Sequence, residues 1–363
     1  MMHSRYGKDS LSARQAQEMA HIIAFGPVIF QVSRVMLDYG IFDYLRSRTD
    51  DGATVGEVAQ AVCITDYAAK VLLESSITLG TVLCNDGRYS LSKVGWFFLT
   101  DPMVKVNMDF NYDINYKGMF HLEEALVEGR PAGLAELGPW KTIYEGLSLL
   151  SPQQQSSWFG FDHFYSDSAF DDALPKVFAS APSRILDIGG NTGKWAMKCV
   201  GYSKDVMVTV ADLPGQISML EKQIAGQPGA DRVDTFSIDI LDRDSRLPYG
   251  YDAVWMSQFL DCFSDRQVVD ILMRVTESLN PGGRVFIMET LWDRQKYTAA
   301  SFDLAQTSVY FTAMANGNSK MFNSEDLMSY IRESSLEPVS IADGLGYAHS
   351  LIECTKSDKR RNN

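Results

Sequence analysis

Cysteine is scarce in this sequence, and its placement excludes two classes of protein. The 363-residue chain has five cysteines, which are scattered and form no C-x-x-C pair. An odd number of dispersed thiols argues against a disulfide framework and predicts a reducing compartment. The spacing of the cysteines matches no set of metal ligands, so we expect no metal site. The cysteines stand at positions 63, 84, 199, 262 and 354.

Positive charge and long apolar runs are also in short supply. Lys and Arg number 33 against 46 Asp and Glu, which gives a net charge of −13. Because phosphate neutralisation needs a basic surface, this balance argues against broad binding to nucleic acid or to an acidic membrane. The first ten residues are polar, and the apolar stretch Ile22–Val32 is interrupted and too short to span a bilayer. These features predict a cytoplasmic protein without a signal peptide.

The remaining composition is that of a globular chain, with 45% hydrophobic and 22% charged residues. The length suggests about two domains. In the first hundred or so residues, a predicted capping box at Thr54 opens a helix over 55–62, and Thr65 opens a second helix. Two short strands then flank the turn signal Asn85-Asp86-Gly87. Helix, turn, helix and hairpin in this order is the winged-helix pattern.

A winged helix serves either DNA recognition or dimerisation. The second helix carries Asp66, Lys70 and Glu74 but no arginine, so it lacks the side chains for phosphate and guanine contacts. Ahead of it, the stretch Ala20–Leu45 has more apolar surface than one small module needs to bury. We therefore expect a homodimer that hides this surface, with no nucleic acid as partner.

From Arg184 onward the pattern changes to strands that alternate with helices. Such alternation predicts right-handed crossovers and a parallel sheet with both faces covered. A helix over Ser324–Ser334, with Ser324 as its N-cap, and two final strands near Pro338–Ile341 and Ser350–Thr355 complete the sheet. The five earlier predicted strands are Arg184–Ile188, Val206–Ala211, Val233–Ile238, Tyr251–Met256 and Arg284–Glu289.

The first of these strands ends in an acid and a glycine-rich turn. Gly189, Gly190 and Gly193 allow a ligand to approach the backbone closely. A dinucleotide fingerprint needs G-x-G-x-x-G, and this loop is one residue too short. Asp187 ahead of the loop would also repel a pyrophosphate. A ligand with an ammonium group and no phosphate fits better, and S-adenosylmethionine has both properties.

Two further acids support a ligand site at the same edge of the sheet. Asp212 ends the second predicted strand, where a carboxylate can accept hydrogen bonds from ribose hydroxyls. Asp239 ends the third strand, where it can accept one from an adenine amino group. The carboxyl ends of successive parallel strands border one crevice, so the ordered set of three acids predicts one binding site.

At this point the chain resembles the class I S-adenosylmethionine-dependent methyltransferases, in particular the small-molecule O-methyltransferases of the plant caffeate and flavonoid type and the bacterial polyketide-tailoring type. The resemblance implies an α/β Rossmann-like catalytic domain, with a seven-stranded and mostly parallel sheet, preceded by a mainly α winged-helix dimerisation domain. We expect this dimerisation domain over 1–110, a helical connector that adds to the substrate pocket over 111–180, the catalytic domain over 181–356 and a polar tail over 357–363. The matching segments are Asp187–Gly193 (family D-x-G-G-G-x-G), Asp212-Leu213-Pro214 (D-L-P), Ile238-Asp239-Ile240 (G-D-M) and Asn280–Val285 followed by Glu289.

By this likeness S-adenosylmethionine is the cofactor, and its contacts carry over residue by residue. Gly189 lines the methionine moiety, Asp212 binds the ribose, and Asp239 with Ile240 brackets the adenine. Ser257 stands where the family has a lysine, and Phe263 where an aromatic residue packs on the adenine. Asp187, Gly190 and Leu213 complete the set of expected cofactor residues.

The likeness fails at the catalytic residues. Asp261 stands in place of the family's base histidine, while Glu289 matches the carboxylate that orients the base. In the segment that matches G-G-x-E-R-T, Ser319 replaces the acid and Lys320 the arginine. Asp261 serves as a base only if burial beside Glu289 raises its pKa; otherwise it is a solvated residue or a helix cap.

Other candidates for chemistry are weaker. His163 lies in a segment that resembles the family's segment over the cofactor and is a less favoured base, as is His121. Cys262 has no histidine nearby in the sequence, so we expect a structural thiol.

The expected reaction is methyl transfer from S-adenosylmethionine to an oxygen of a small aromatic or polyene-like molecule. An acceptor that is already ionised, such as a carboxylate or an acidic phenol, needs no strong base. One alternative keeps the bound cofactor but changes the reaction to decarboxylation or hydroxylation. Another is a winged-helix regulator that senses the cofactor, against which the acidic recognition helix counts.

Overall fold

The chain forms two compact units, which are described separately. The computed structural model describes residues 6–48 and 51–357. The units divide between Asp113 and Ile114. The last six residues of the polar tail expected over 357–363 lie outside the described residues.

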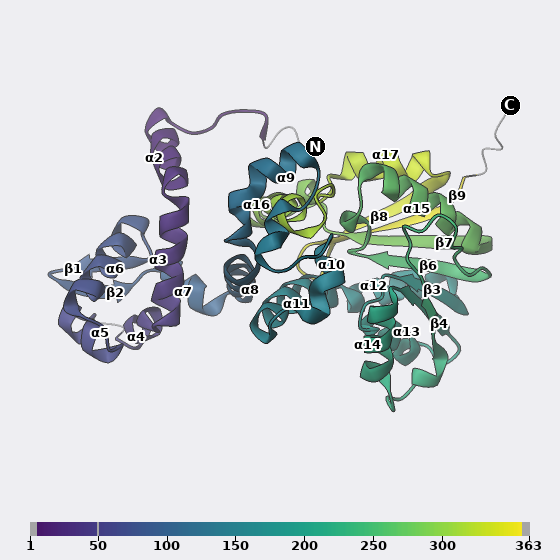
Figure 1. Ribbon diagram of the computed structural model, residues 1–363, viewed down its shortest axis with the longest axis horizontal. Helices are drawn as coiled ribbons and strands as arrows, with labels where there is room; N and C mark the ends of the chain where they lie inside the picture. The colour runs from purple at the N-terminus through teal and green to yellow at the C-terminus, as the bar shows by residue number, and fades with distance from the viewer. Residues whose placement is uncertain (1–5, 49–50, 358–363) are drawn as a thin grey trace. The chain divides into compact units, whose positions relative to one another are not determined.

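The amino-terminal unit is a bundle of helices with one hairpin (Figure 1). Thr54 caps α5 together with Glu57, and Thr65 caps α6, so the predicted helix pair is confirmed. Strands β1 and β2 pair antiparallel around the turn at 86–87, which confirms the hairpin. The helices are α2 (Ala13–Ala24), α3 (Gly26–Asp38), α4 (Ile41–Ser47), α5 (Val55–Ala61), α6 (Asp66–Leu79), α7 (Lys93–Thr100) and α8 (Pro102–Phe110), and the strands are β1 (Val82–Asn85) and β2 (Arg88–Leu91).

The core of this unit is built from α3, α4, α5, α6 and the hairpin. Met36, Ile41, Phe42 and Leu73 are fully buried in it. Helix α2 buries none of its residues, although it carries large apolar side chains such as Ile23, which is 70% exposed. In the described part of the chain no single helix has the length and apolar composition of a membrane span; α2 and α3 reach them only as a pair bent by 69°.

The second unit contains a seven-stranded sheet in the order β5-β4-β3-β6-β7-β9-β8. The five strands from β5 to β7 run parallel, and β9 is antiparallel to both of its neighbours, which confirms the predicted mostly parallel sheet. The strands are β3 (Arg184–Ile188), β4 (Met207–Asp212), β5 (Val233–Ser237), β6 (Tyr251–Ser257), β7 (Leu279–Glu289), β8 (Leu336–Leu345) and β9 (His349–Lys356).

Helices cover both faces of this sheet (Figure 1). Apolar side chains of α12, α13 and α14 pack with Trp255 and Phe286 on one face, and those of α15 and α17 pack with Val254 and Ile287 on the other. The helices of this unit are α9 (Leu122–Glu128), α10 (Ile143–Gly146), α11 (Pro152–Ser166), α12 (Phe170–Val177), α13 (Lys194–Tyr202), α14 (Pro214–Ile224), α15 (Asp265–Ser278), α16 (Thr298–Tyr310) and α17 (Ser324–Glu333).

Several predicted element bounds differ from the structure, and the starts of α17 and β7 are two examples. The N-cap of α17 is Asn323, whose side chain accepts a hydrogen bond from the Asp326 N–H, whereas Ser324 begins the helix and donates to Asp293. Both residue types cap helices, so composition alone could not choose between them. Strand β7 begins at Leu279, five residues before the predicted start at Arg284.

Candidate active site

The glycine loop after β3 lies close to neighbouring strands because its glycines carry no side chains. The Gly189 N–H donates to the Ala211 carbonyl over 2.9 Å, and the loop then turns into α13 at Gly193, which has φ +78°. A Cβ atom on Gly190 would lie 2.6 Å from Asp187 Oδ2, and one on Gly189 would overlap the Phe259 ring. The loop therefore forms a tight backbone cradle at the carboxyl edge of the sheet.

Asp187 and Asp212 flank this cradle. Asp187 is 1% exposed, and its Oδ2 has no hydrogen-bond partner within residues 6–48 and 51–357. Burial, followed by the nearby Asp212 carboxylate, raises the pKa of Asp187 well above its usual range. Asp212 accepts hydrogen bonds from the Asn191 N–H at 2.9 Å and the Leu213 N–H at 2.7 Å, which hold its carboxylate against the loop.

The other expected cofactor residues lie at the same edge of the sheet. Asp239, after β5, is exposed and accepts a hydrogen bond from the Leu241 N–H, while Ile240 is buried. Ser257 ends β6, and its hydroxyl is buried without a partner in the described part of the chain. The Phe263 ring packs edge-on against Phe259 with 4.8 Å between ring centroids.

This arrangement fits S-adenosylmethionine. The cradle excludes Cβ atoms, and buried acceptor oxygens on Asp187 and Ser257 lack donors within the described ranges. Buried acceptors without donors are costly, so a bound molecule that supplies N–H or O–H groups would stabilise them.

Asp261 and Glu289 form a buried carboxyl pair next to the cradle. Asp261 lies in the short 3₁₀ turn η8 (Leu260–Cys262) and is 2% exposed; Glu289 ends β7 and is 1% exposed. Glu289 Oε1 accepts hydrogen bonds from the Phe259 N–H at 3.2 Å and the Leu260 N–H at 3.0 Å. Asp261 is therefore not a solvated side chain, and the N-cap of α15 is Ser264, not Asp261.

Burial dominates the electrostatics of this pair. It raises the pKa of Asp261 to about 7, with a hydrogen bond from the Cys262 thiol acting in the opposite direction and the Asp162 carboxylate adding to the rise. The pKa of Glu289 is raised well above its usual range by burial and then by Asp261. Burial thus favours the neutral, protonated form of both carboxyl groups more than it would for exposed side chains, and the charge of Asp261 adds to this effect at Glu289.

Residues distant in the sequence complete the surroundings of the pair. Asp162 comes from α11, Tyr144 from α10 and Tyr310 from α16, and the Trp158 indole N–H donates to the Tyr310 hydroxyl over 2.9 Å. The sequence predicts only that a helical connector over 111–180 adds to the substrate pocket. Since no local motif links these positions to Asp261, only the fold brings them together.

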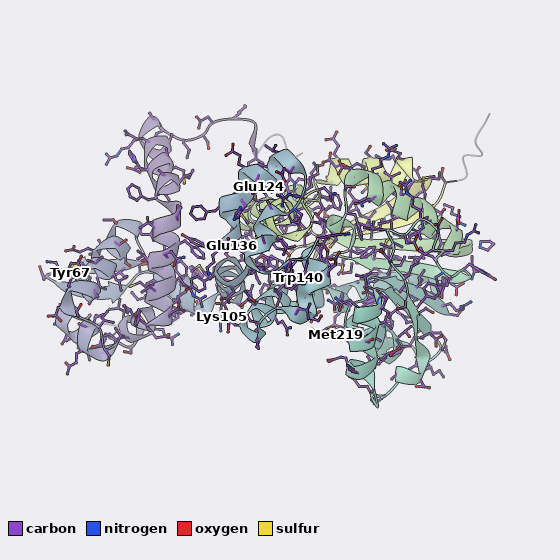
Figure 2. All side chains as sticks on the ribbon, viewed as in Figure 1. Tyr67, Lys105, Glu124, Glu136, Trp140 and Met219 are labelled. Carbon is purple, nitrogen blue, oxygen red and sulfur yellow. The ribbon has the colours of Figure 1, made fainter. Side chains whose placement is uncertain are left out.

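The two candidate histidines are engaged elsewhere. His163 Nδ1 lies 3.6 Å from Asp167 Oδ1, and Asp167 also binds Lys194 Nζ at 2.5 Å. The ring nitrogens of His121 each lie 3.4 Å from a carboxylate, on Glu124 of α9 and on Glu136 of the next 3₁₀ turn. Figure 2 labels these two glutamates. Within residues 6–48 and 51–357, neither imidazole pairs with Asp261 or Glu289, which makes both weaker candidates for a base.

Asn316 joins the turn that carries Asp261 to the segment that follows α16. Its side-chain amide donates to the Cys262 carbonyl, and its Oδ1 accepts hydrogen bonds from the Ser319 N–H at 3.2 Å and hydroxyl at 3.0 Å. Ser319 is buried, and Lys320 pairs with Asp326 at 2.9 Å. The segment thus supplies no carboxylate to the site but fixes the turn that carries Asp261.

Comparison with known proteins agrees with the geometry. Residues 17–89 match a Dimerisation2-like domain and residues 166–328 an O-methyltransferase domain. The chain is 27% identical over 271 residues to 3-hydroxy-5-methyl-1-naphthoate 3-O-methyltransferase of Streptomyces sahachiroi, covering 73% of this chain and 75% of that protein.

Solved structures show the same fold. The apo S-adenosylmethionine-dependent methyltransferase SibL aligns with a TM-score of 0.70 and 25% identity, covering 93% of this chain and 98% of that one. The O-methyltransferase NcsB1 from neocarzinostatin biosynthesis, in complex with S-adenosylmethionine and 2-hydroxy-5-methyl naphthoic acid, aligns with a TM-score of 0.66 and 18% identity, covering 90% and 96%. The chain therefore belongs to the S-adenosylmethionine-dependent O-methyltransferase family and carries an amino-terminal dimerisation domain.

Proposed function

We propose that this enzyme transfers the methyl group of S-adenosylmethionine to a hydroxyl oxygen of a small aromatic molecule, with Asp261 as the group that accepts the hydroxyl proton. The observation that carries the proposal is the burial of Asp261 beside Glu289 at the edge of the glycine cradle. The relative from Streptomyces sahachiroi is named for methylation of a hydroxynaphthoate, which supports an aromatic acceptor.

We assign the cofactor residues from the family resemblance, and their positions at the carboxyl edge of the sheet support this assignment. Asp187, Gly189 and Gly190 would hold the methionine end, and Asp212 with Leu213 the ribose. At the adenine end would lie Asp239, Ile240 and Phe263, with Ser257 between the two ends. Bound S-adenosylmethionine supplies an electrophilic methyl group on its sulfonium. The protein's part is to place the acceptor oxygen in line with that methyl group, which is worth several kcal/mol.

The raised pKa of Asp261 answers the objection that a carboxylate is too weak a base. An ordinary aspartate lies about six pKa units below a phenol, which costs roughly 8 kcal/mol for full proton transfer. With the pKa of Asp261 at about 7, the gap falls to about three units, or roughly 4 kcal/mol. Burial beside Glu289 therefore removes about half of the mismatch.

A graded series of phenols tests this role. We expect Asp261→Asn to lower kcat strongly for weakly acidic phenols and little for phenols that are already ionised. Asp205→Asn, at an exposed aspartate, is the matched control and should leave every rate unchanged. An equal loss across the series would remove Asp261 as the proton acceptor. Consumption of the acceptor without formation of S-adenosylhomocysteine would instead favour decarboxylation or hydroxylation.

The amino-terminal unit supports a homodimer. We assign residues 1–110 to a winged-helix dimerisation domain, 111–180 to a connector and 181–356 to the catalytic domain. Met19, Ile22 and Ile23 of α2, and Phe25 directly after it, are between 46% and 70% exposed, and a second copy would cover this surface. Light scattering on the purified chain should give twice the monomer mass, and Ile23→Asp should shift it toward the monomer.

A further inference from the structure

Two residues with amide side chains, just beyond the carboxyl ends of β3 and β6, combine a left-handed backbone with a buried side-chain oxygen that lacks a hydrogen-bond partner in the described part of the chain. Asn191, in the glycine loop, has φ +48°, and Gln258, directly after β6, has φ +44°. Residues other than glycine rarely adopt this left-handed region, and each such residue stores backbone strain. The side-chain oxygens Asn191 Oδ1 and Gln258 Oε1 are both buried, and neither has a hydrogen-bond partner in the described part of the chain.

The two residues belong to neighbouring strand ends. Strands β3 and β6 pair in parallel, with Ile188 opposite Met256. Asn191 lies three residues beyond Ile188, and Gln258 two residues beyond Met256, so both follow the carboxyl edge of the central strand pair. The two strand ends also meet at Phe259, whose ring fills the space next to Gly189.

Hydrogen bonds on either side hold both strained residues in place. The Asn191 N–H donates to Asp212 Oδ2, and the Gln258 N–H donates to the Met288 carbonyl, each over 2.9 Å. Glu289 Oε1 then accepts from the next two backbone N–H groups after Gln258. The surrounding structure thus enforces an unfavourable backbone at two positions, and it leaves a buried acceptor without a donor at each. Strained backbone and buried polar atoms without partners are found together at ligand-binding sites, where the ligand supplies the missing hydrogen bonds.

We propose that Asn191 and Gln258 are two further contacts to the methionine end of S-adenosylmethionine, with their amide oxygens accepting hydrogen bonds from its ammonium group. The ammonium carries three N–H donors, and the unpartnered Asp187 Oδ2 lies at the same loop. The inference rests on the cofactor site proposed above and adds to it two residues that the family's motif does not supply: Asn191 occupies a position where the motif has glycine.

Binding calorimetry with two ligands tests the inference. S-adenosylhomocysteine carries the amino-acid end, and 5′-methylthioadenosine lacks it. Asn191→Gly removes the acceptor and relieves the strain, and Gln258→Met removes the acceptor at similar length. Each variant should weaken S-adenosylhomocysteine binding roughly tenfold or more, as expected for a hydrogen bond to a charged group. Each should leave the affinity for 5′-methylthioadenosine unchanged.

Another residue with a left-handed backbone, far from these strands in the sequence, provides the control. Asp86 has φ +48° in the turn between β1 and β2, so Asp86→Gly relieves comparable strain away from the crevice and should change neither affinity. Unchanged S-adenosylhomocysteine affinity in both crevice variants would overturn the inference. So would an equal loss for 5′-methylthioadenosine, which would mark general damage to the loop. Failure of the unmodified chain to bind either ligand would instead overturn the cofactor site itself, and this inference with it.

Discussion

The buried Asp261–Glu289 pair makes a specific prediction about stability and pH. Burial raises the pKa of Asp261 from its ordinary value of 3.8 to about 7. The folded chain therefore binds this proton more tightly than the unfolded chain does. The site contributes most to stability below about pH 4, and this contribution is lost as the pH rises to about 7. The raised pKa of Glu289 acts in the same direction.

The magnitude follows from the size of the shift. A rise of about three units, at 1.36 kcal/mol per unit, costs about 4 kcal/mol of stability near pH 8.5 and roughly 1.5–2 kcal/mol near pH 5. Asp261→Asn replaces the carboxyl by a neutral group of the same shape, which does not pay this cost. We expect the variant to be more stable than the unmodified chain, with a gap that widens by about 2–3 kcal/mol between these two pH values.

Thermal unfolding followed by circular dichroism at the two pH values measures this gap. For a large domain, 1 kcal/mol moves the midpoint by about 2–4 °C, so even a fraction of the predicted change is detectable. Asp205→Asn, at an exposed position, should show no pH-dependent gap. Two results would refute the assignment of a buried carboxyl pair with raised pKa values. One is a stability difference between Asp261→Asn and the unmodified chain that stays constant with pH. The other is a variant that is less stable than the unmodified chain near pH 8.5.

Three further substitutions probe the site and its support. Asp212→Ala removes the acceptor of the Asn191 and Leu213 N–H groups and should weaken S-adenosylhomocysteine binding roughly a hundredfold in calorimetry; retained affinity would contradict the ribose assignment. Asn316→Ala removes the hydrogen bonds to the Cys262 carbonyl and from the Ser319 N–H and hydroxyl. It should lower kcat about tenfold and leave the cofactor affinity unchanged. An equal loss of kcat and of cofactor affinity would show that the whole site is destabilised. His349, fully buried with a pKa lowered by burial to about 3, makes the fold lose stability as the pH falls below about 6.5. His349→Gln should flatten this acid limb in thermal unfolding, and an unchanged limb would exclude His349 as its cause.

Regular elements of both units could be predicted from the sequence because strong local signals agree with the fold. The strand Arg184–Ile188 was predicted with its observed bounds, since an apolar run followed by glycine leaves little choice. The capping box at Thr54 was confirmed for the same reason, because both of its hydrogen bonds are local. The N-cap of α17 was placed one residue late, because Asn323 and Ser324 are both capable caps.

The surroundings of Asp261 could not be predicted in this way. Asp162 and Tyr144 lie about a hundred residues from Asp261 in the chain, and only the packing of α10 and α11 brings them close. The left-handed backbone of Gln258 likewise depends on the hydrogen bond from its N–H to the carbonyl of Met288 in β7. Motif matching predicted Asp261 as the candidate base, whereas its burial depends on contacts with residues that are distant in the sequence.

Methyl transfer itself is the most direct test of the central claim. The purified chain, incubated with methyl-labelled S-adenosylmethionine and a set of hydroxynaphthalenes, should yield a product that carries the label on its hydroxyl oxygen, together with one S-adenosylhomocysteine per product. Mass spectrometry of both products measures this stoichiometry. Tight cofactor binding without label in any acceptor, or label on carbon or nitrogen alone, would contradict the account.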